Sequence, residues 1–314
     1  MVKMKKINFI FIIYLLSAVF LITPAPARCE SDIGVIPTGL IGWEISSSRG
    51  EAGAGGPSYI IGTIHSMYHP KYAFNRYFDV YMSSCEVFVM ESKNSLFTSK
   101  NETDYFLPKD TDMKKLLGEE KWGKLVEACR KNSIDSEFNK YMPWYLSVLL
   151  TRPEIRNKES VIMDQHLHDK ALEKSLKIYG LETMATSSLN KIPLEAQIEE
   201  LEEIISSLDE IKTAETEIMS AYNSGDTQKL SLIINKNSPG RKGKITANRV
   251  NSLLMDERNS IWLPAIEKHI NDGRCFIAVG VAHLIGKKSI IESLKSNGYA
   301  VKNISVPSSE FSKK

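Results

Sequence analysis

The sequence predicts an α/β protein with a central mixed sheet, flanking helices and a helical insertion. Short apolar runs rich in β-branched and aromatic residues, typical of buried strands, alternate with stretches of helical periodicity. The tetrapeptide Gly-x-x-His follows two of these runs, at residues 62–65 and 280–283. A glycine just past a strand permits a close approach, and open α/β sheets bind ligands outside the carboxyl ends of their strands. The two motifs are therefore expected at one site.

The N-terminus has the pattern of a targeting segment. Lysines precede a long apolar run, and Ala25-Pro26-Ala27 resembles a small-residue cleavage site. We therefore expect a signal peptide at residues 1–27 and an exported protein, periplasmic or secreted. The α/β domain is expected at 32–314, with helical insertions at about 95–175 and 190–270, where helical periodicity dominates. The apolar run is somewhat long for a signal peptide, so an uncleaved membrane anchor is the alternative.

Composition narrows the class of protein. Hydrophobic residues make up 42% of the 314 residues, which is ample for a core. The net charge of +2 gives no support for binding nucleic acid. The four cysteines have no spacing typical of a disulfide framework or a Cys-type zinc site. Cys85 and Cys275 lie in strand-like runs and are expected to be buried thiols.

The first strands form a hairpin. Strand-like segments at 43–46 and 59–61 flank a loop at 47–57 that is rich in serine, glycine and alanine. The glycines of this loop are not followed by the lysine of a phosphate-binding loop. The segment therefore indicates a plain connecting loop.

Helices and strands then alternate as far as residue 182. Aromatic residues at helical spacing predict a helix around 74–81, which leads to a strand that ends at Glu91. From about 104 to 172 the pattern is helical with proline punctuation, and a strand-like run then ends at Glu182.

The C-terminal part repeats the alternation. Residues 194–211 carry apolar side chains every three or four positions, which predicts one long amphipathic helix with an acidic outer face. A helix at about 246–269 precedes the second Gly-x-x-His strand. A helix at 289–296 and a strand at 300–306 close the domain.

Four predicted strand ends carry ionisable residues, namely His65, Glu91, Glu182 and His283. Adjacent strands lie about 4.8 Å apart, so side chains at neighbouring strand ends can converge. Two imidazoles with one or two carboxylates match the ligands of a divalent site for Zn, Mn or Co. The same groups can also work without a metal, with a histidine or glutamate as the base. In chain order, both glutamates come between the two histidines.

Other charged or ionisable residues are further candidates for the site or for the surface. Arg258 is a fifth candidate, because a guanidinium can clamp a carboxylate or stabilise an oxyanion. Asp164, His166 and His168 are expected on a helix, and the two histidines at its surface, since His-x-His on a helix points its two rings to different faces. His269 is expected near a helix C-terminus, where a cation suits the helix dipole.

Several common catalytic motifs are absent from the sequence. It has no Gly-x-Ser-x-Gly nucleophile elbow, no His-Glu-x-x-His helix and no phosphate-binding loop with its lysine. These absences disfavour serine hydrolases of that type, zincin metalloproteases and P-loop enzymes.

A set of motifs covers nearly all of the chain beyond the targeting segment. In order they are Tyr59-Ile-Ile-Gly-Thr-Ile-His65, Val87-Phe-Val-Met-Glu91, Gly180-Leu-Glu-Thr183, Glu257-Arg-Asn259, Ala278-Val-Gly-Val-Ala-His-Leu-Ile-Gly286 and Asn297-Gly-Tyr-Ala-Val301. Together they resemble the TraB/GumN family, which includes the Tiki proteins and the pheromone-shutdown proteins. Each motif alone is weak, whereas the ordered set is specific.

The resemblance implies a fold, a cofactor and a set of site residues. The fold is an α/β domain of the erythromycin-esterase and ChaN-like type. Tiki proteins are metal-dependent peptidases that need Mn or Co, and Zn is also possible here. Carried over by motif, the metal ligands would be His65, His283 and Glu91. The catalytic residues would be Glu91, Arg258 and Glu182.

The resemblance therefore favours a metal-dependent, peptidase-like hydrolase of peptide or similar acyl bonds, acting in the periplasm or outside the cell. The expected partner is a peptide or small-molecule substrate, with no nucleic acid and with membrane contact only through an uncleaved N-terminal segment. A haem- or peptide-binding protein of ChaN-like type without turnover is one alternative. A metal-free esterase that uses histidine and glutamate is another.

Overall fold

The computed structural model describes residues 36–47, 56–64, 67–68, 72–74, 76–92, 102–151, 161–182, 189–236 and 255–308. The expected signal peptide at 1–27 and the histidine His65 lie outside these ranges. Within the described ranges, no helix is both long enough and apolar enough to cross a membrane.

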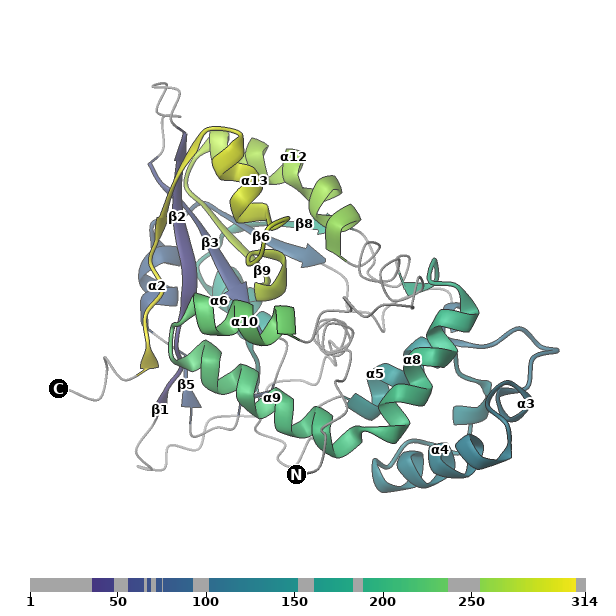
Figure 1. Ribbon diagram of the computed structural model, residues 1–314. Helices are drawn as coiled ribbons and strands as arrows, with labels where there is room; N and C mark the ends of the chain where they lie inside the picture. Colours follow the sequence, from purple (N-terminus) through teal and green to yellow (C-terminus); the bar gives the residue numbers. More distant parts are fainter. Residues whose placement is uncertain are drawn as a thin grey trace.

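The protein has an α/β fold built on a six-stranded mixed sheet, as the sequence predicts (Figure 1). The strand order across the sheet is β10-β2-β3-β9-β6-β8. In chain order the strands are β2 (Ile41–Ser47), β3 (Ser58–Thr63), β6 (Val87–Ser92), β8 (Lys177–Glu182), β9 (Cys275–Gly280) and β10 (Tyr299–Asn303). The expected hairpin is confirmed, because β2 pairs antiparallel with β3.

Four neighbouring strands run parallel and end at one edge of the sheet. β3 pairs with β9, β9 with β6, and β6 with β8, all in parallel. The register aligns Thr63 with Gly280 and Ser92 with Glu182. The strand that precedes the second Gly-x-x-His motif therefore lies between the strand of the first motif and the strand of Glu91, an order that differs from the chain order.

Burial differs between the middle and the edge of this parallel set. Every residue of β3 and β9 is buried, as expected for strands covered on both faces. The edge strand β8 is half-exposed, and its Tyr179 is 43% exposed. The expectation that each site strand is a buried run is therefore wrong for β8, because no strand of this sheet covers its outer edge.

Helices cover both faces of the sheet. The helices are α2 (Arg76–Ser83), α3 (Met113–Leu117), α4 (Glu119–Lys131), α5 (Pro143–Thr151), α6 (Met163–Glu173), α8 (Leu194–Ser206), α9 (Leu208–Asn223), α10 (Thr227–Lys236), α12 (Glu257–Asp272) and α13 (Ile290–Ser296). Figure 1 shows α12 and α13 together on one side of the sheet and α2 on the other. Helices α3, α4, α5 and α8 pack on one another away from the sheet.

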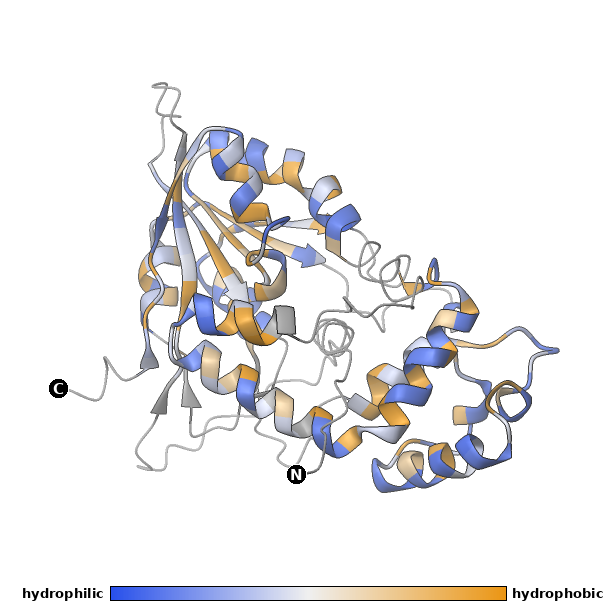
Figure 2. Cartoon of the chain, viewed as in Figure 1, coloured by the Kyte–Doolittle hydropathy of each residue, from blue (hydrophilic) through white to orange (hydrophobic). Residues whose placement is uncertain are grey.

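The expected single helix at 194–211 is in fact two helices. α8 ends at Ser206 and α9 begins at Leu208, and Ser207 between them has φ −141° and ψ 23°. In Figure 2 both helices alternate hydrophobic and hydrophilic residues, while α5 is largely hydrophobic. The apolar spacing continues through the break because both helices bury one face, so periodicity alone does not reveal it.

Short two-stranded pairings complete the described backbone. β1 (Ile36–Pro37) pairs parallel with β5 (Tyr72–Ala73), and β4 (Met67–Tyr68) pairs antiparallel with β7 (Val161–Ile162). These strands were not predicted, because two residues are too few to show a period.

Candidate active site

Three of the expected site residues lie where the parallel strands end. Glu91 is the penultimate residue of β6 and Glu182 is the last residue of β8. His283 ends a short 3₁₀ turn, η5 (Val281–His283), directly after β9. The fourth, His65, follows β3 but lies outside the described residues. The sheet therefore delivers two carboxylates and an imidazole to one edge.

Arg258 links these groups from helix α12, which packs against β8 and β9. Its Nη2 donates to Glu91 Oε2 at 2.8 Å and to Glu182 Oε1 at 2.9 Å, and its Nε donates to Glu182 Oε2 at 3.2 Å. Nη1 lies 3.4 Å from His283 Nε2. Arg258 is only 6% exposed. One buried guanidinium thus connects both carboxylates and the imidazole.

Trp262 forms the floor beneath this arginine. The Arg258 guanidinium carbon lies 4.3 Å from the Trp262 ring centroid, and the His283 ring centroid lies 4.6 Å from it. Trp262 comes four residues after Arg258, so both side chains project from the same face of α12. The indole face attracts the cation and restricts the positions of both the guanidinium and the imidazole. No role was predicted for Trp262, although its position four residues after Arg258 could have indicated one.

The motif glycines allow close approaches at the edge. The Gly280 N–H donates to Glu91 Oε1 at 2.7 Å. At Gly62 an added Cβ would come within 2.7 Å of Val281 Cγ2 and 3.1 Å of Val281 Cα. Glycine at position 62 therefore lets η5, which carries His283, pack directly on β3.

Burial and opposite charge set the protonation of the cluster. Burial raises the pKa of the Glu182 carboxyl above its ordinary value, and Arg258 opposes that rise. Burial also acts to lower the pKa of the Arg258 guanidinium, but Glu91 and Glu182 outweigh it, so that pKa is raised. The arginine is a fixed cation at any physiological pH and compensates for the burial of its two partners.

The donor atoms are of the right chemistry for a divalent ion. Imidazole and carboxylate groups bind Zn and Mn. His283 Nε2 and Glu91 Oε1 lie 3.9 Å apart, so these two atoms would be the ones that hold an ion here. Within the described ranges, however, no group of three His, Cys, Asp or Glu side chains is arranged to hold a metal. The pair fits an ion only with a further ligand, for which His65 is the expected source.

His166 is half-buried rather than at the surface, contrary to expectation, and Asp164 on the same helix is buried. Asp164 is 5% exposed and accepts a hydrogen bond from Thr63 Oγ1 at 2.8 Å, which ties the start of α6 to the end of β3. His166 stacks on Phe74 with ring centroids 4.1 Å apart. The helical pattern misled because α6 packs against the sheet edge and α2 rather than facing solvent.

His269 lies in the last turn of α12, as expected, but its surroundings do not favour a cation. Partial burial lowers the pKa of His269 below its ordinary value, and Lys268 adds to this effect. The His269 ring lies 5.0 Å from that of Tyr179. The buried cysteines match expectation, since Cys85 and Cys275 are both buried thiols.

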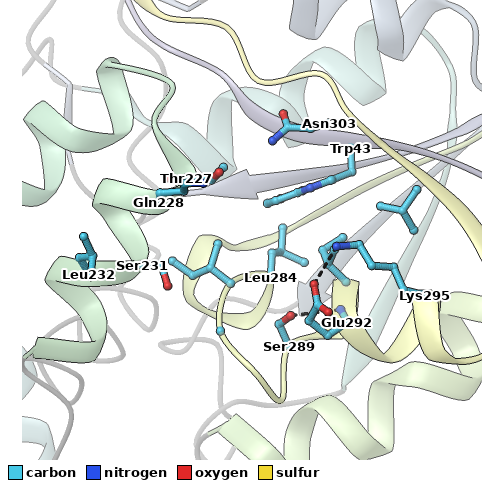
Figure 3. Close-up of a pocket in the computed structure, with 14 residues that line it drawn as sticks. Trp43, Thr227, Gln228, Ser231, Leu232, Leu284, Ser289, Glu292, Lys295 and Asn303 are labelled. Carbon is cyan, nitrogen blue, oxygen red and sulfur yellow. Dashed lines mark hydrogen bonds and ion pairs between the residues drawn. The ribbon is translucent and has the colours of Figure 1, made fainter.

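A separate hollow of about 560 Å³ adjoins the segment after His283 (Figure 3). Leu284, Ile285 and Gly286 form one wall, and α10, α13, β2 and β10 provide the rest. Lys295 and Glu292 are paired at its rim, 2.7 Å apart between Nζ and Oε1. The hollow has both apolar and polar side chains in its lining. Its wall residue Leu284 directly follows His283 of the Arg258 cluster.

The chain is similar to one family of known proteins. The model of the TraB/PrgY/gumN family matches residues 43–303, which is nearly the whole chain. No curated protein and no solved structure gave a match. The matched region contains the six-stranded sheet, apart from the first two residues of β2, and the Glu91, Glu182, Arg258 and His283 cluster. The chain therefore belongs to the TraB/PrgY/gumN family.

Proposed function

We infer that this protein is a hydrolase of peptide or similar acyl bonds, with its active site at the carboxyl edge of the parallel strands. The observation that supports this most is the buried Arg258, which holds Glu91 and Glu182 beside His283. Burying a cation with two carboxylates is costly in stability. Perturbed ionisable groups of this kind concentrate at functional sites.

Each residue of the cluster has a task in this proposal. Glu91, whose Oε1 lies 3.9 Å from His283 Nε2, accepts a proton from the attacking water. Arg258 orients Glu91 through the hydrogen bond from Nη2 to Glu91 Oε2. Glu182 engages two nitrogens of Arg258 and so fixes the plane of the guanidinium. Because Arg258 is engaged by both glutamates, its main role in this proposal is to position them, and stabilising an oxyanion is secondary.

A divalent ion, Mn or Co with Zn also possible, belongs to the proposal. His65, His283 and Glu91 would hold it. When bound, such an ion supplies Lewis acidity that makes water a better nucleophile near neutral pH. The proposal also places the protein outside the cytoplasm, in the periplasm or secreted, on the basis of the N-terminal sequence.

A metal-independent esterase is a second candidate, and one observation favours it. Arg258 already donates to Glu91 Oε2 and to both Glu182 oxygens. Its Nη1 also lies 3.4 Å from His283 Nε2. A guanidinium in that position provides a resident cation. His283 or Glu91 can then act as the base without a metal.

A peptide-library and ester-library cleavage assay tests the proposal. The wild-type chain is assayed with Mn, Co or Zn added, and again after exhaustive chelation. His65→Ala and His283→Gln are each expected to abolish cleavage, while His168→Gln on α6 serves as the matched histidine control. Cleavage that His283→Gln leaves intact contradicts the site. Cleavage that survives chelation contradicts the metal and supports the esterase, and tight binding of peptide or haem without turnover contradicts both enzymes.

A further inference from the structure

Asn259 contacts His283 on the side of the ring opposite to Arg258. Asn259 Oδ1 lies 2.6 Å from His283 Nδ1. Both residues are buried, at 6% and 1% exposure. A buried hydrogen bond this short needs a proton between the two atoms, and which atom carries it determines the state of the imidazole.

The orientation of the Asn259 amide settles which atom is the donor. Asn259 Nδ2 donates to the Lys288 carbonyl oxygen at 3.1 Å. Only the NH₂ end of the amide can donate to a carbonyl, so the oxygen end faces His283. An amide oxygen is an acceptor, and His283 Nδ1 must therefore carry the hydrogen.

The opposite ring nitrogen leads to the same conclusion. Arg258 Nη1 lies 3.4 Å from His283 Nε2, and a guanidinium can only donate. Nε2 is therefore the acceptor. Glu91 Oε1 lies farther from Nε2, at 3.9 Å, which is beyond hydrogen-bond distance. Arg258 thus favours the same tautomer, but its contact at 3.4 Å is weaker than the Asn259 contact at 2.6 Å.

We propose that Asn259 is a positioning residue that holds His283 as the Nδ1–H tautomer and leaves the Nε2 lone pair facing the Arg258 guanidinium. Nε2 is the atom that would accept a proton or bind a metal in the proposed hydrolase, so this inference extends that function. The tautomer itself is a property of the resting protein and does not depend on turnover. A histidine whose second nitrogen is fixed in this way is a common arrangement in catalytic and metal sites.

Nuclear magnetic resonance of the full chain labelled with ¹⁵N-histidine tests the proposal. The protein has six histidines, and His283→Gln identifies the resonances of His283 by their loss. The wild type is expected to show His283 with a protonated Nδ1 and an unprotonated Nε2. A wild-type Nε2–H tautomer or an imidazolium at neutral pH would overturn the proposal, whether or not the protein cleaves anything.

Variants of Asn259 separate positioning from packing. Asn259→Leu removes the acceptor and is expected to yield a mixture in which the Nε2–H form of His283 is detected. Asn259→Asp keeps an acceptor at Nδ1 and is expected to keep Nδ1 protonated. Asn271→Leu, on the exposed surface of the same helix, is the control and should leave His283 unchanged. An unmixed Nδ1–H signal in Asn259→Leu contradicts the role, and the wild-type spectrum decides if that variant does not fold.

Discussion

At the scale of single residues, Arg258 is the buried cation that balances the charges of Glu91 and Glu182. Two carboxylates at the ends of β6 and β8 would repel each other if buried alone. The arginine compensates both, and Trp262 supports its planar face. A lysine could not replace it, because an ammonium lacks the fork that reaches both Glu182 oxygens and Glu91 at once.

Replacing Arg258 is therefore expected to destabilise the fold strongly. Arg258→Met should lower the free energy of unfolding by about 3–5 kcal/mol, because it leaves two buried carboxylates without a counter-ion. Urea unfolding measures this change. Arg130→Met, at an exposed site on α4, should change it by less than about 0.5 kcal/mol. Equal effects of the two variants would show that Arg258 does not compensate the cluster.

His166 makes the stability of the protein depend on pH. Burial against Phe74 lowers the pKa of His166 from 6.5 to about 4, and Lys170 adds to this effect. Between these values the unfolded chain binds the proton and the folded chain does not. Stability should therefore fall as pH falls from about 6.5 to 4, by about 2 kcal/mol, since partial exposure screens the effect.

Urea unfolding at pH 7 and pH 4.5 checks this expectation. His166→Phe keeps the stacked ring and removes the titration, so its loss of stability between the two pH values should be smaller than that of the wild type. An unchanged pH-dependent loss in the variant would assign the effect to other groups.

At the scale of elements, the contact between β3 and η5 determines where His283 lies. Gly62 provides the space for Val281, and Tyr222 donates to the Gly62 carbonyl at 2.7 Å. The sequence marks both glycines of the Gly-x-x-His motifs. It does not reveal that one of them faces the turn of the other motif, because that contact depends on β3 and β9 being neighbours.

Gly62→Ala is expected to lower the free energy of unfolding by about 1–3 kcal/mol, because the new methyl group overlaps Val281. Gly123→Ala is the matched control. Gly123 lies inside α4 with nothing within 4 Å of an added Cβ, so this change should stabilise the protein by about 0.5–1 kcal/mol. The two variants should move the urea midpoint in opposite directions, and a shift in the same direction would contradict the close packing.

The break between α8 and α9 shows what periodicity misses at this scale. Ser207 followed by Glu210 has the spacing of a helix-start motif, and it lay inside the apolar pattern. Ser207 makes no side-chain capping bond. A local signal was present, but the hydrophobic spacing on both sides was stronger and predicted one continuous helix.

At the scale of the whole molecule, the sequence identifies strand ends better than it orders them. Buried runs predicted β3, β6 and β9, and Glu91, Glu182 and His283 could be named from their places at strand ends. The lateral order of the strands depends on long-range pairing, and periodicity carries no information about it. The partners of Arg258 and the contact of Asn259 with His283 could not be predicted either, since both join residues that are distant in the chain.

The same topology places Glu91 at the carboxyl edge of the parallel strands, where it is proposed to be the base of a hydrolytic site. The most direct test is kcat/KM of Glu91→Gln on the peptide or ester that the wild type cleaves fastest. Gln preserves the shape of the side chain and removes its basicity. Glu173→Gln, on the surface of α6, is the control, and thermal unfolding confirms that both variants are folded. We expect a loss of at least about 100-fold in Glu91→Gln with wild-type activity in the control, and near-wild-type activity in a folded Glu91→Gln would contradict the role of Glu91 as the base.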